Sequence, residues 1–320
     1  MPVNSNKPLQ WKTDIAQSVD MYNDWFMEFA PTAFRNTRIQ TTKDVEAALF
    51  AASYLTKINP AIFRNTPDIL PTLRMSTCPP LAVDRLIGLA GVPAGMVKRI
   101  ENEKKLPARM AAADVDRELA KIGAIIGKMA DPDIFVWLGT EKTPTETEIH
   151  RAATIVADRL CGSVANPIIR NAQEKRQLAA IKTWLEARGY TQLPPGDGTR
   201  FDAMQPGTFS FRMNVPVKLE NKVRSVNIPI DVVIMPKNAK ARQLPMFFKI
   251  QSVDGFGKTN KYRKFNSAIM AQMHIIFGKR IQFNLLLCGY FDSSYLGYEA
   301  AEGIDWVWEH RMDDLALFGI

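Results

Sequence analysis

The sequence is poor in the side chains on which many hydrolytic and metal-binding sites depend. It contains only three cysteines and three histidines, all far apart: Cys78, Cys161, Cys288, His150, His274 and His310. Without a CxxC pair or clustered histidines, the pattern argues against a disulfide framework and against a structural zinc site. Nucleophilic catalysis by serine or cysteine would need a histidine partner, and none stands in a recognisable context. Any chemistry is therefore expected to use carboxylates, lysines and a hard metal ion.

Long apolar runs, internal repeats and low-complexity tracts are also lacking. No run reaches the roughly 18 to 20 residues that a membrane span needs, and the N-terminal MPVNSNKPLQWKTD has no apolar signal-peptide core. We therefore expect a cytoplasmic protein with no membrane segment. Its 320 residues, 46% hydrophobic and 23% charged, are enough for two globular domains.

Positive charge is in excess, with a formal net charge of +8. Such a balance is compatible with a nucleic-acid partner, an anionic membrane or simple solubility. Its placement is more informative, because one stretch of 28 residues holds eight basic side chains and a single acid. These are Lys237, Lys240, Arg242, Lys249, Lys258, Lys261, Arg263, Lys264 and the acid Asp254. That density favours contact with a nucleic acid, although a basic structural protein without a DNA role stays open.

The first half of the chain has apolar residues at helical spacing. This spacing predicts helices over 13–29, 43–57, about 110–128 and about 145–161. Because the pattern changes near Pro167, we expect a helical domain over residues 1–165 and a second domain over 166–320.

Residues 81–105 have the outline of a helix-turn-helix. A helix over 81–89 meets a turn of small residues, AGV, and a second helix opens with Pro93. Basic and amide side chains on the second helix are Lys98, Arg99, Asn102 and Lys105. Two interpretations remain open: an αα-hairpin that packs against the core, or a DNA-binding motif in which Lys98 and Arg99 contact DNA.

The second half alternates between helical and strand-like patterns. The predicted elements are a helix over 168–189, strands over 208–217, 226–235 and 245–253, a helix over 259–277, a strand over 281–290 and a helix over 310–318. Three consecutive strands can pair as a meander, and the helix that leads to the next strand makes a crossover. The fold class is therefore a mixed α/β (α+β) core of order αβββαβ with a large N-terminal helical domain.

The chemistry in this core is expected where the second and third strands end. Asp231 lies in the apolar run NIPID, where an acid is costly unless it is paired or bound to a metal. Lys249 and Gln251 share one face of the third strand, because side chains alternate along a strand. A purely structural role, in which Asp231 caps a turn or pairs with a lysine, is also possible.

Several sequence blocks resemble one enzyme family. They are PID at 229–231, PMFFKIQS at 245–252, MSTCPPLAVDRLIGLAGV at 75–92, NPIIRNAQEKRQLAAI at 166–181, NIPIDVVIMPK at 227–237 and TNKYRK at 259–264. Together they resemble the XamI-type type II restriction endonucleases of the PD-(D/E)XK nuclease superfamily, over nearly the whole chain. The resemblance implies a dimeric, Mg²⁺-dependent enzyme that cuts double-stranded DNA at a short palindrome such as GTCGAC, with a cognate DNA methyltransferase as partner in a restriction-modification system.

The resemblance also implies roles for particular residues. Asp231 corresponds to the metal-binding aspartate, and the helix acid Glu174 and the nearby Asp254 are auxiliary acids, Asp254 a second candidate metal ligand. Side chains expected to contact phosphates or base edges are Lys258, Asn260, Lys261, Arg263 and Lys264. Helix capping by Asn260 and ordinary surface charge at Arg263 are the alternatives.

Two motif positions depart from the family pattern. Lys249 stands where the superfamily has Glu or Asp, and Gln251 stands where it has Lys. Glutamine can position a water but cannot act as a base. A charged lysine cannot ligate magnesium, which demands oxygen donors, and a unit charge pair about 4 Å apart interacts by roughly 4 kcal/mol at an effective dielectric of 20. Lys249 or Lys261 could supply the positive charge lost at Gln251. A nuclease with a rearranged site and a DNA-binding protein that no longer cuts, with Lys249 neutralising a phosphate, are therefore both open.

Overall fold

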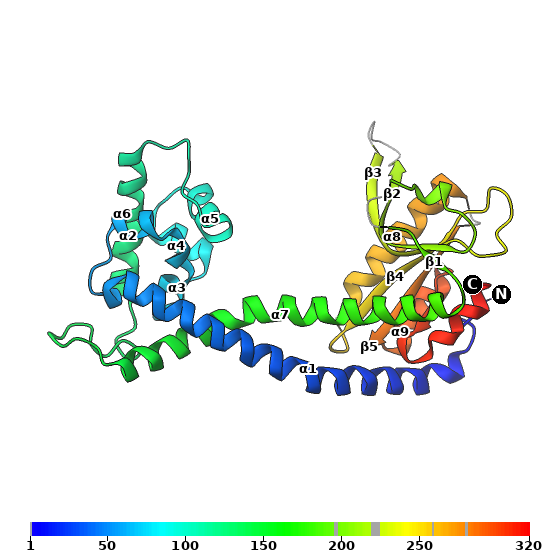
Figure 1. Cartoon of the computed structure of the whole chain (residues 1–320), viewed down its shortest axis with the longest axis horizontal. Helices are drawn as coiled ribbons and strands as arrows, with labels where there is room; N and C mark the ends of the chain where they lie inside the picture. Colours follow the sequence, from blue (N-terminus) through cyan, green and yellow to red (C-terminus); the bar gives the residue numbers. More distant parts are fainter. Residues whose placement is uncertain (1, 195–197, 219–224, 258, 279–280) are drawn as a thin grey trace. The chain divides into compact units, whose positions relative to one another are not determined.

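The structure, a computed structural model, describes residues 2–194, 198–218, 225–257, 259–278 and 281–320. It divides into two compact units, a sheet unit of residues 1–29 and 170–320 and a helical unit of residues 30–169. Two long helices have residues in both, α1 (Pro8–Ala51) and α7 (Glu146–Ala187) (Figure 1). Each contains a proline close to the unit border, Pro31 in α1 and Pro167 in α7.

The helical unit is built from short helices around one apolar core. Besides its parts of α1 and α7, they are α2 (Pro60–Asn65), α3 (Leu70–Met75), α4 (Val83–Ala90), α5 (Ala94–Glu103) and α6 (Ala112–Met129). The predicted helix-turn-helix corresponds to α4 and α5. Gly91 ends α4 with φ of +59°, a left-handed conformation that glycine adopts without steric cost. Leu86 and Ile100 from the two helices are fully buried in the shared core.

The sheet unit contains a six-stranded mixed sheet of order β1-β2-β3-β4-β5-β6. The strands are β1 (Thr191–Gln192), β2 (Thr208–Lys218), β3 (Ser225–Ile234), β4 (Met246–Val253), β5 (Gln282–Gly289) and β6 (Asp305–Trp308). β2, β3 and β4 form an antiparallel meander, and α8 (Asn260–Phe277) leads from β4 to the parallel strand β5. The predicted αβββαβ core and the mixed α/β class are confirmed.

Helices cover both faces of this sheet. On one face Phe247 and Leu285 pack with Met273 of α8, Tyr295 of α9 (Ser293–Ala301) and Trp11 of α1. On the other face, side chains of β3 and β4 pack with the C-terminal part of α7 and with the 3-10 helix η4 (Glu309–Phe318). Both clusters are buried, so the central strands carry apolar side chains on both faces. This is expected for strands of a sheet that helices cover on both sides.

Some elements differ from the sequence-based expectation. The helices expected over 13–29 and 43–57 are one helix, α1, and those over 145–161 and 168–189 are one helix, α7. The helix expected over 310–318 is the 3-10 helix η4, and β6 and α9 were not predicted. Residues 1–29, expected in the helical domain, pack in the sheet unit instead, where the rings of Trp11 and Trp306 lie 5.6 Å apart. Within the described residues, no helix has the length and apolarity to cross a membrane.

Candidate nuclease active site

A fork between β3 and β4 creates the position that Asp231 occupies. The two strands pair through Val232, Val233 and Ile234 of β3, and Asp231 is the first residue outside this paired segment. The Oδ2 atom of Asp231 accepts a hydrogen bond of 2.8 Å from the main-chain N–H of Ile250. Where the two strands part, the Asp231 carboxylate thus accepts the hydrogen bond that a main-chain carbonyl of β3 would otherwise accept. The N–H of Ile250 is therefore not left unpaired.

Lys249 provides the counter-charge for Asp231. Its Nζ lies 2.8 Å from Asp231 Oδ1, and the side chains are only 19% and 15% exposed. Burial raises the pKa of the Asp231 carboxyl, while the Lys249 ammonium and the Ile250 amide work in the opposite direction. Both carboxylate oxygens are therefore engaged by hydrogen-bond donors.

Glu174 on α7 is the next carboxylate in the site. Its charge contributes to raising the pKa of Asp231, so the two acids interact electrostatically. Glu174 Oε1 accepts hydrogen bonds of 2.8 and 3.2 Å from the guanidinium of Arg212 on β2. Arg212 was not predicted as a site residue. An exposed polar position is ordinary in an alternating strand and gives no functional signal, and only the backbone conformation of Arg212, with φ of +53°, marks the position.

Gln251, the other predicted motif residue, points into the protein. It is only 2% exposed, its Nε2 donates to Asn266 Oδ1 at 2.8 Å, and its Oε1 accepts from the Tyr295 hydroxyl at 2.7 Å. Asn266 in turn donates to Glu299 Oε1 at 3.0 Å. The structure therefore brings Asp231, Lys249 and Glu174 together and turns the Gln251 side chain into a buried polar cluster.

The donor set does not fit a magnesium ion as the side chains stand. Among the described residues, no group of three or more His, Cys, Asp or Glu side chains is placed to hold a metal ion. The Lys249 ammonium contacts Asp231 Oδ1, an oxygen that a magnesium ion would need as a ligand. The ammonium itself has no lone pair and cannot act as a ligand. Asp254 is exposed just after β4. The pKa of Tyr22 is raised to about 12, mainly by the burial of Tyr22 and next by the negative charge of Asp254.

The predicted DNA-binding side chains lie in two places. Lys261, Arg263 and Lys264 lie in the first turns of α8, where Arg263 stacks 3.8 Å from the ring of Tyr298. Thr259 holds the N-cap position of α8, so the exposed Asn260 does not cap that helix, and Lys258 lies outside the described residues.

In the helical unit the two predicted basic side chains on α5 are both in ion pairs. Lys98 pairs with Asp84 at 3.2 Å, and Arg99 pairs with Glu103 at 3.2 Å. Both pairs are exposed, and exposed pairs of this kind contribute little to stability. Neither the αα-hairpin interpretation nor the DNA-binding interpretation is decided by these contacts.

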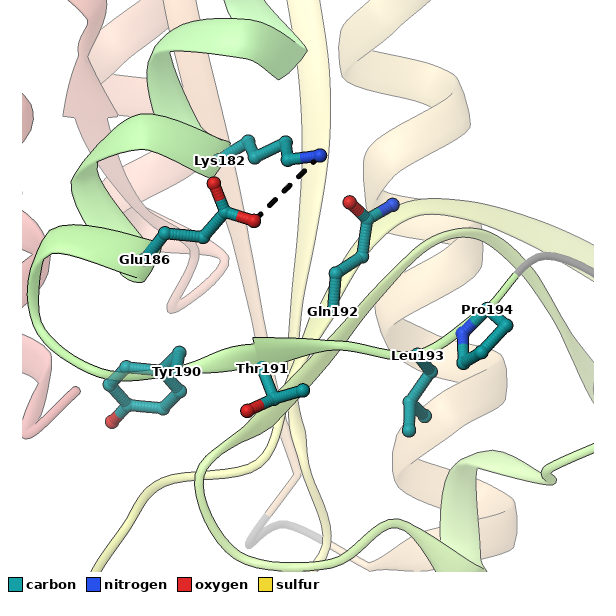
Figure 2. A pocket seen from close by; sticks show the side chains of 7 residues that line it. All are labelled: Lys182, Glu186, Tyr190, Thr191, Gln192, Leu193 and Pro194. Atoms are coloured by element: carbon teal, nitrogen blue, oxygen red, sulfur yellow. Dashed lines mark ion pairs between the residues drawn. The ribbon is translucent and has the colours of Figure 1, made fainter.

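A shallow depression of about 590 Å³ lies elsewhere in the sheet unit (Figure 2). It is lined by the end of α7 and by β1 and the residues around it: Lys182, Glu186, Tyr190, Thr191, Gln192, Leu193 and Pro194. The side chains of Lys182 and Glu186 form an ion pair of 3.7 Å there. Neither Asp231 nor Lys249 lines it, so the candidate active site is the strand fork and not this depression.

A mixed αβββαβ core with a buried aspartate where two central strands part is the arrangement expected of a restriction-endonuclease-like hydrolase. The sequence profile described as XamI restriction endonuclease matches residues 53–308. The type II restriction enzyme SalI of Streptomyces albus G is 45% identical over 317 residues, which cover 99% of each chain. The chain therefore belongs to the XamI restriction endonuclease family, and the predicted resemblance is confirmed.

One solved structure was also matched, the protein VC1899 from Vibrio cholerae, at 11% identity and a TM-score of 0.28. The match covers 80% of this chain and 55% of that one.

Proposed function

We propose that this protein is a type II restriction endonuclease that cuts double-stranded DNA at a short palindrome. The observation that carries the proposal is the position of Asp231 in the β3–β4 fork of a chain that belongs to a restriction endonuclease family. The reaction is hydrolysis of a phosphodiester, in which an in-line water attacks phosphorus and the 3′ oxygen leaves. Its transition state gains negative charge, which a positioned cation stabilises.

Magnesium is the cofactor that the family resemblance implies, and Asp231 and Glu174 are the two acids of the fork whose charges interact. Because Lys249 holds one Asp231 oxygen, a divalent ion could bind there only after this pair rearranges. Asp254 is kept as a predicted auxiliary acid. For Gln251 we propose a supporting role, in which its bonds to Asn266 and Tyr295 fix β4 and α8.

DNA is proposed to contact the positive side chains at the start of α8, Lys261, Arg263 and Lys264, together with Asn260 and Lys258. In the helical unit, Lys98 and Arg99 are proposed as further contacts. A nuclease that cuts at a frequent short site must be kept from the host genome, so a cognate DNA methyltransferase in the cytoplasm is the proposed partner.

A second function is favoured by one specific observation. Both oxygens of Asp231 already accept hydrogen bonds from protein donors, which leaves neither of them open to a metal ion. The alternative is therefore a protein that binds DNA without cutting it. In that case Lys249 would neutralise a phosphate at the fork.

Plasmid cleavage with Mg²⁺ or Mn²⁺, run beside a gel-shift assay, separates the two functions. The substrate is a plasmid with one GTCGAC site, and the shift probes are a GTCGAC duplex and a duplex of the same composition in scrambled order. Cleavage at one position supports the endonuclease. A specific shift without cleavage under either metal overturns it in favour of the binding protein, and no preference between the duplexes overturns both.

A further inference from the structure

The backbone at Arg212 departs from an ordinary strand. The β2–β3 ladder pairs Phe211 with Val232 and Met213 with Ile230, and it skips the pair between them, Arg212 and Asp231. Arg212 has φ of +53°, which a residue with a side chain adopts only at a cost of order 1–3 kcal/mol. Strain of this kind persists where the surrounding structure holds it, and it gathers at functional sites.

The strained backbone at Arg212 accompanies a contact between its guanidinium and Glu174. Arg212 of β2 lies opposite Asp231 of β3. Its guanidinium donates a hydrogen bond to Glu174, and the charge of Glu174 contributes to raising the pKa of Asp231. Its side chain is 62% exposed, far more than that of Lys249 at 19%. An exposed arginine–carboxylate pair contributes little stability. The Arg212–Glu174 pair therefore does not offset the free-energy cost of the strained backbone at Arg212.

The site also lacks the cation that its motif is expected to supply. Gln251 is neutral, and its side chain is buried in bonds to Asn266 and Tyr295. Lys249 is committed to Asp231. Among the residues that the structure describes, Arg212 is thus an exposed cation at the fork. Its planar guanidinium fits the oxygens of a phosphate with two parallel hydrogen bonds.

We infer that Arg212 is a further catalytic residue, which exchanges Glu174 for the phosphate of the bound DNA strand and donates hydrogen bonds to its non-bridging oxygens. The inference rests on the proposed function, which names double-stranded DNA as the substrate. It adds that Arg212 is the cation that binds the DNA phosphate. The exchange moves no proton and breaks no covalent bond. It also frees the Glu174 carboxylate at the moment when DNA is in place.

The test uses Arg212→Gly, because glycine accepts the left-handed backbone while the side chain with its guanidinium is removed. Loss of one such donor is expected to lower the single-turnover cleavage rate by roughly 10²–10³-fold, with little change in melting temperature. Added guanidinium ion restores part of the rate in Arg212→Gly and not in the wild type, and Arg212→Lys stays well below wild type. Arg200→Ala is the matched control, because Arg200 forms a similar exposed pair with Asp202 at 2.9 Å and should cut normally.

A binding measurement keeps the inference testable apart from cleavage. With a GTCGAC duplex in metal-free buffer, loss of one phosphate contact should reduce the slope of log affinity against log salt by about 1. A wild-type rate and an unchanged slope in Arg212→Gly overturn the inference while the proposed function stands. If the wild type binds but never cuts, the proposed function fails, and the salt slope alone decides whether Arg212 binds phosphate.

Discussion

Asp231 and Lys249 depend on each other in the fork between β3 and β4. The carboxylate is buried, which raises its pKa, and the ammonium at 2.8 Å offsets part of that cost. Lys249→Met keeps the aliphatic stem and removes the charge, so Asp231 is left without its cation. Breaking a buried ion pair from one side costs about 3–5 kcal/mol, and less here because both side chains keep some exposure.

The expected result for Lys249→Met is a loss of about 2 kcal/mol in the free energy of unfolding at pH 7 and of most cleavage activity. Urea unfolding and the plasmid assay measure the two effects. Lys182→Met is the control, since Lys182 belongs to an exposed pair with Glu186 on the same helix as Glu174. A Lys249→Met protein that is as stable and as active as the wild type would show that the pair has no role.

Glu299 is buried within the polar cluster around Gln251, and one of its oxygens has no hydrogen-bond partner among the described residues. Burial raises its pKa from 4.5 to about 7, against the opposing effects of Asn266 and Arg263. In the unfolded chain the group loses its proton near pH 4.5, while in the folded protein it keeps the proton until about pH 7. The folded state therefore loses stability as pH rises through this window, by up to about 3 kcal/mol.

Glu299→Gln is neutral at every pH and should not show this loss. The free energy of unfolding of Glu299→Gln, minus that of the wild type, is expected to increase from pH 5 to about pH 7 and then to level off. Glu141→Gln is the control, because Glu141 is exposed and its charge is not among the causes that shift the pKa of Glu299. A difference that stays constant from pH 5 to pH 8 would contradict the raised pKa of Glu299.

Secondary-structure elements were predictable where the sequence has a clear period. The strands β2, β3, β4 and β5 and the helix α8 follow from apolar alternation, apolar runs and helical spacing. The continuity of α7 through Pro167 was not predictable, because a proline inside a helix usually ends it. β6 has only four residues, all buried, which is too short for a period to be read.

The candidate site was predictable only in part, and for a physical reason. The acid in an apolar strand singled out Asp231, and the motif spacing singled out Lys249. Whether a side chain points to solvent depends on tertiary contacts, so the burial of Gln251 and the exposure of Arg212 required the structure. The same is true of long-range contacts such as the pairing of the N-terminal segment with β6.

The N-terminal segment is held by β6 through one carboxylate. Asp305 Oδ1 accepts from the main-chain N–H groups of Asn4 and Ser5 at 3.0 Å each, and Val3 also donates to this carboxylate. The main-chain N–H of Trp306 also donates to Asp305 Oδ1, at 2.8 Å, so Asp305→Ala leaves four donors without this acceptor. Each unsatisfied buried donor costs about 1–3 kcal/mol. The free energy of unfolding should therefore fall by several kcal/mol, measured by urea unfolding.

Asp202→Ala is the control for Asp305, because Asp202 forms an exposed pair with Arg200 and should change stability by less than about 1 kcal/mol. An Asp305→Ala protein with wild-type stability would mean that these hydrogen bonds to the Asp305 carboxylate do not stabilise the sheet unit.

At the scale of the whole molecule, one chain carries a single Asp231 and hence a single proposed site. A palindrome has two equivalent strands, so cutting both at equivalent positions needs two sites related by a two-fold axis. We therefore expect a homodimer with one chain acting on each strand.

Mixed dimers test this arrangement directly. Asp231→Asn has nearly the same shape as the wild type and lacks the charge, so a dimer with one such chain should cut one strand only. Wild type and Asp231→Asn, unfolded together and refolded at equal concentration, should therefore accumulate nicked open-circle plasmid before the linear form appears. Each protein refolded alone gives the reference, linear product for the wild type and none for Asp231→Asn. If the mixture yields linear plasmid at half the wild-type rate with no rise in open circles, each active copy cuts both strands, and the two-fold dimer is wrong.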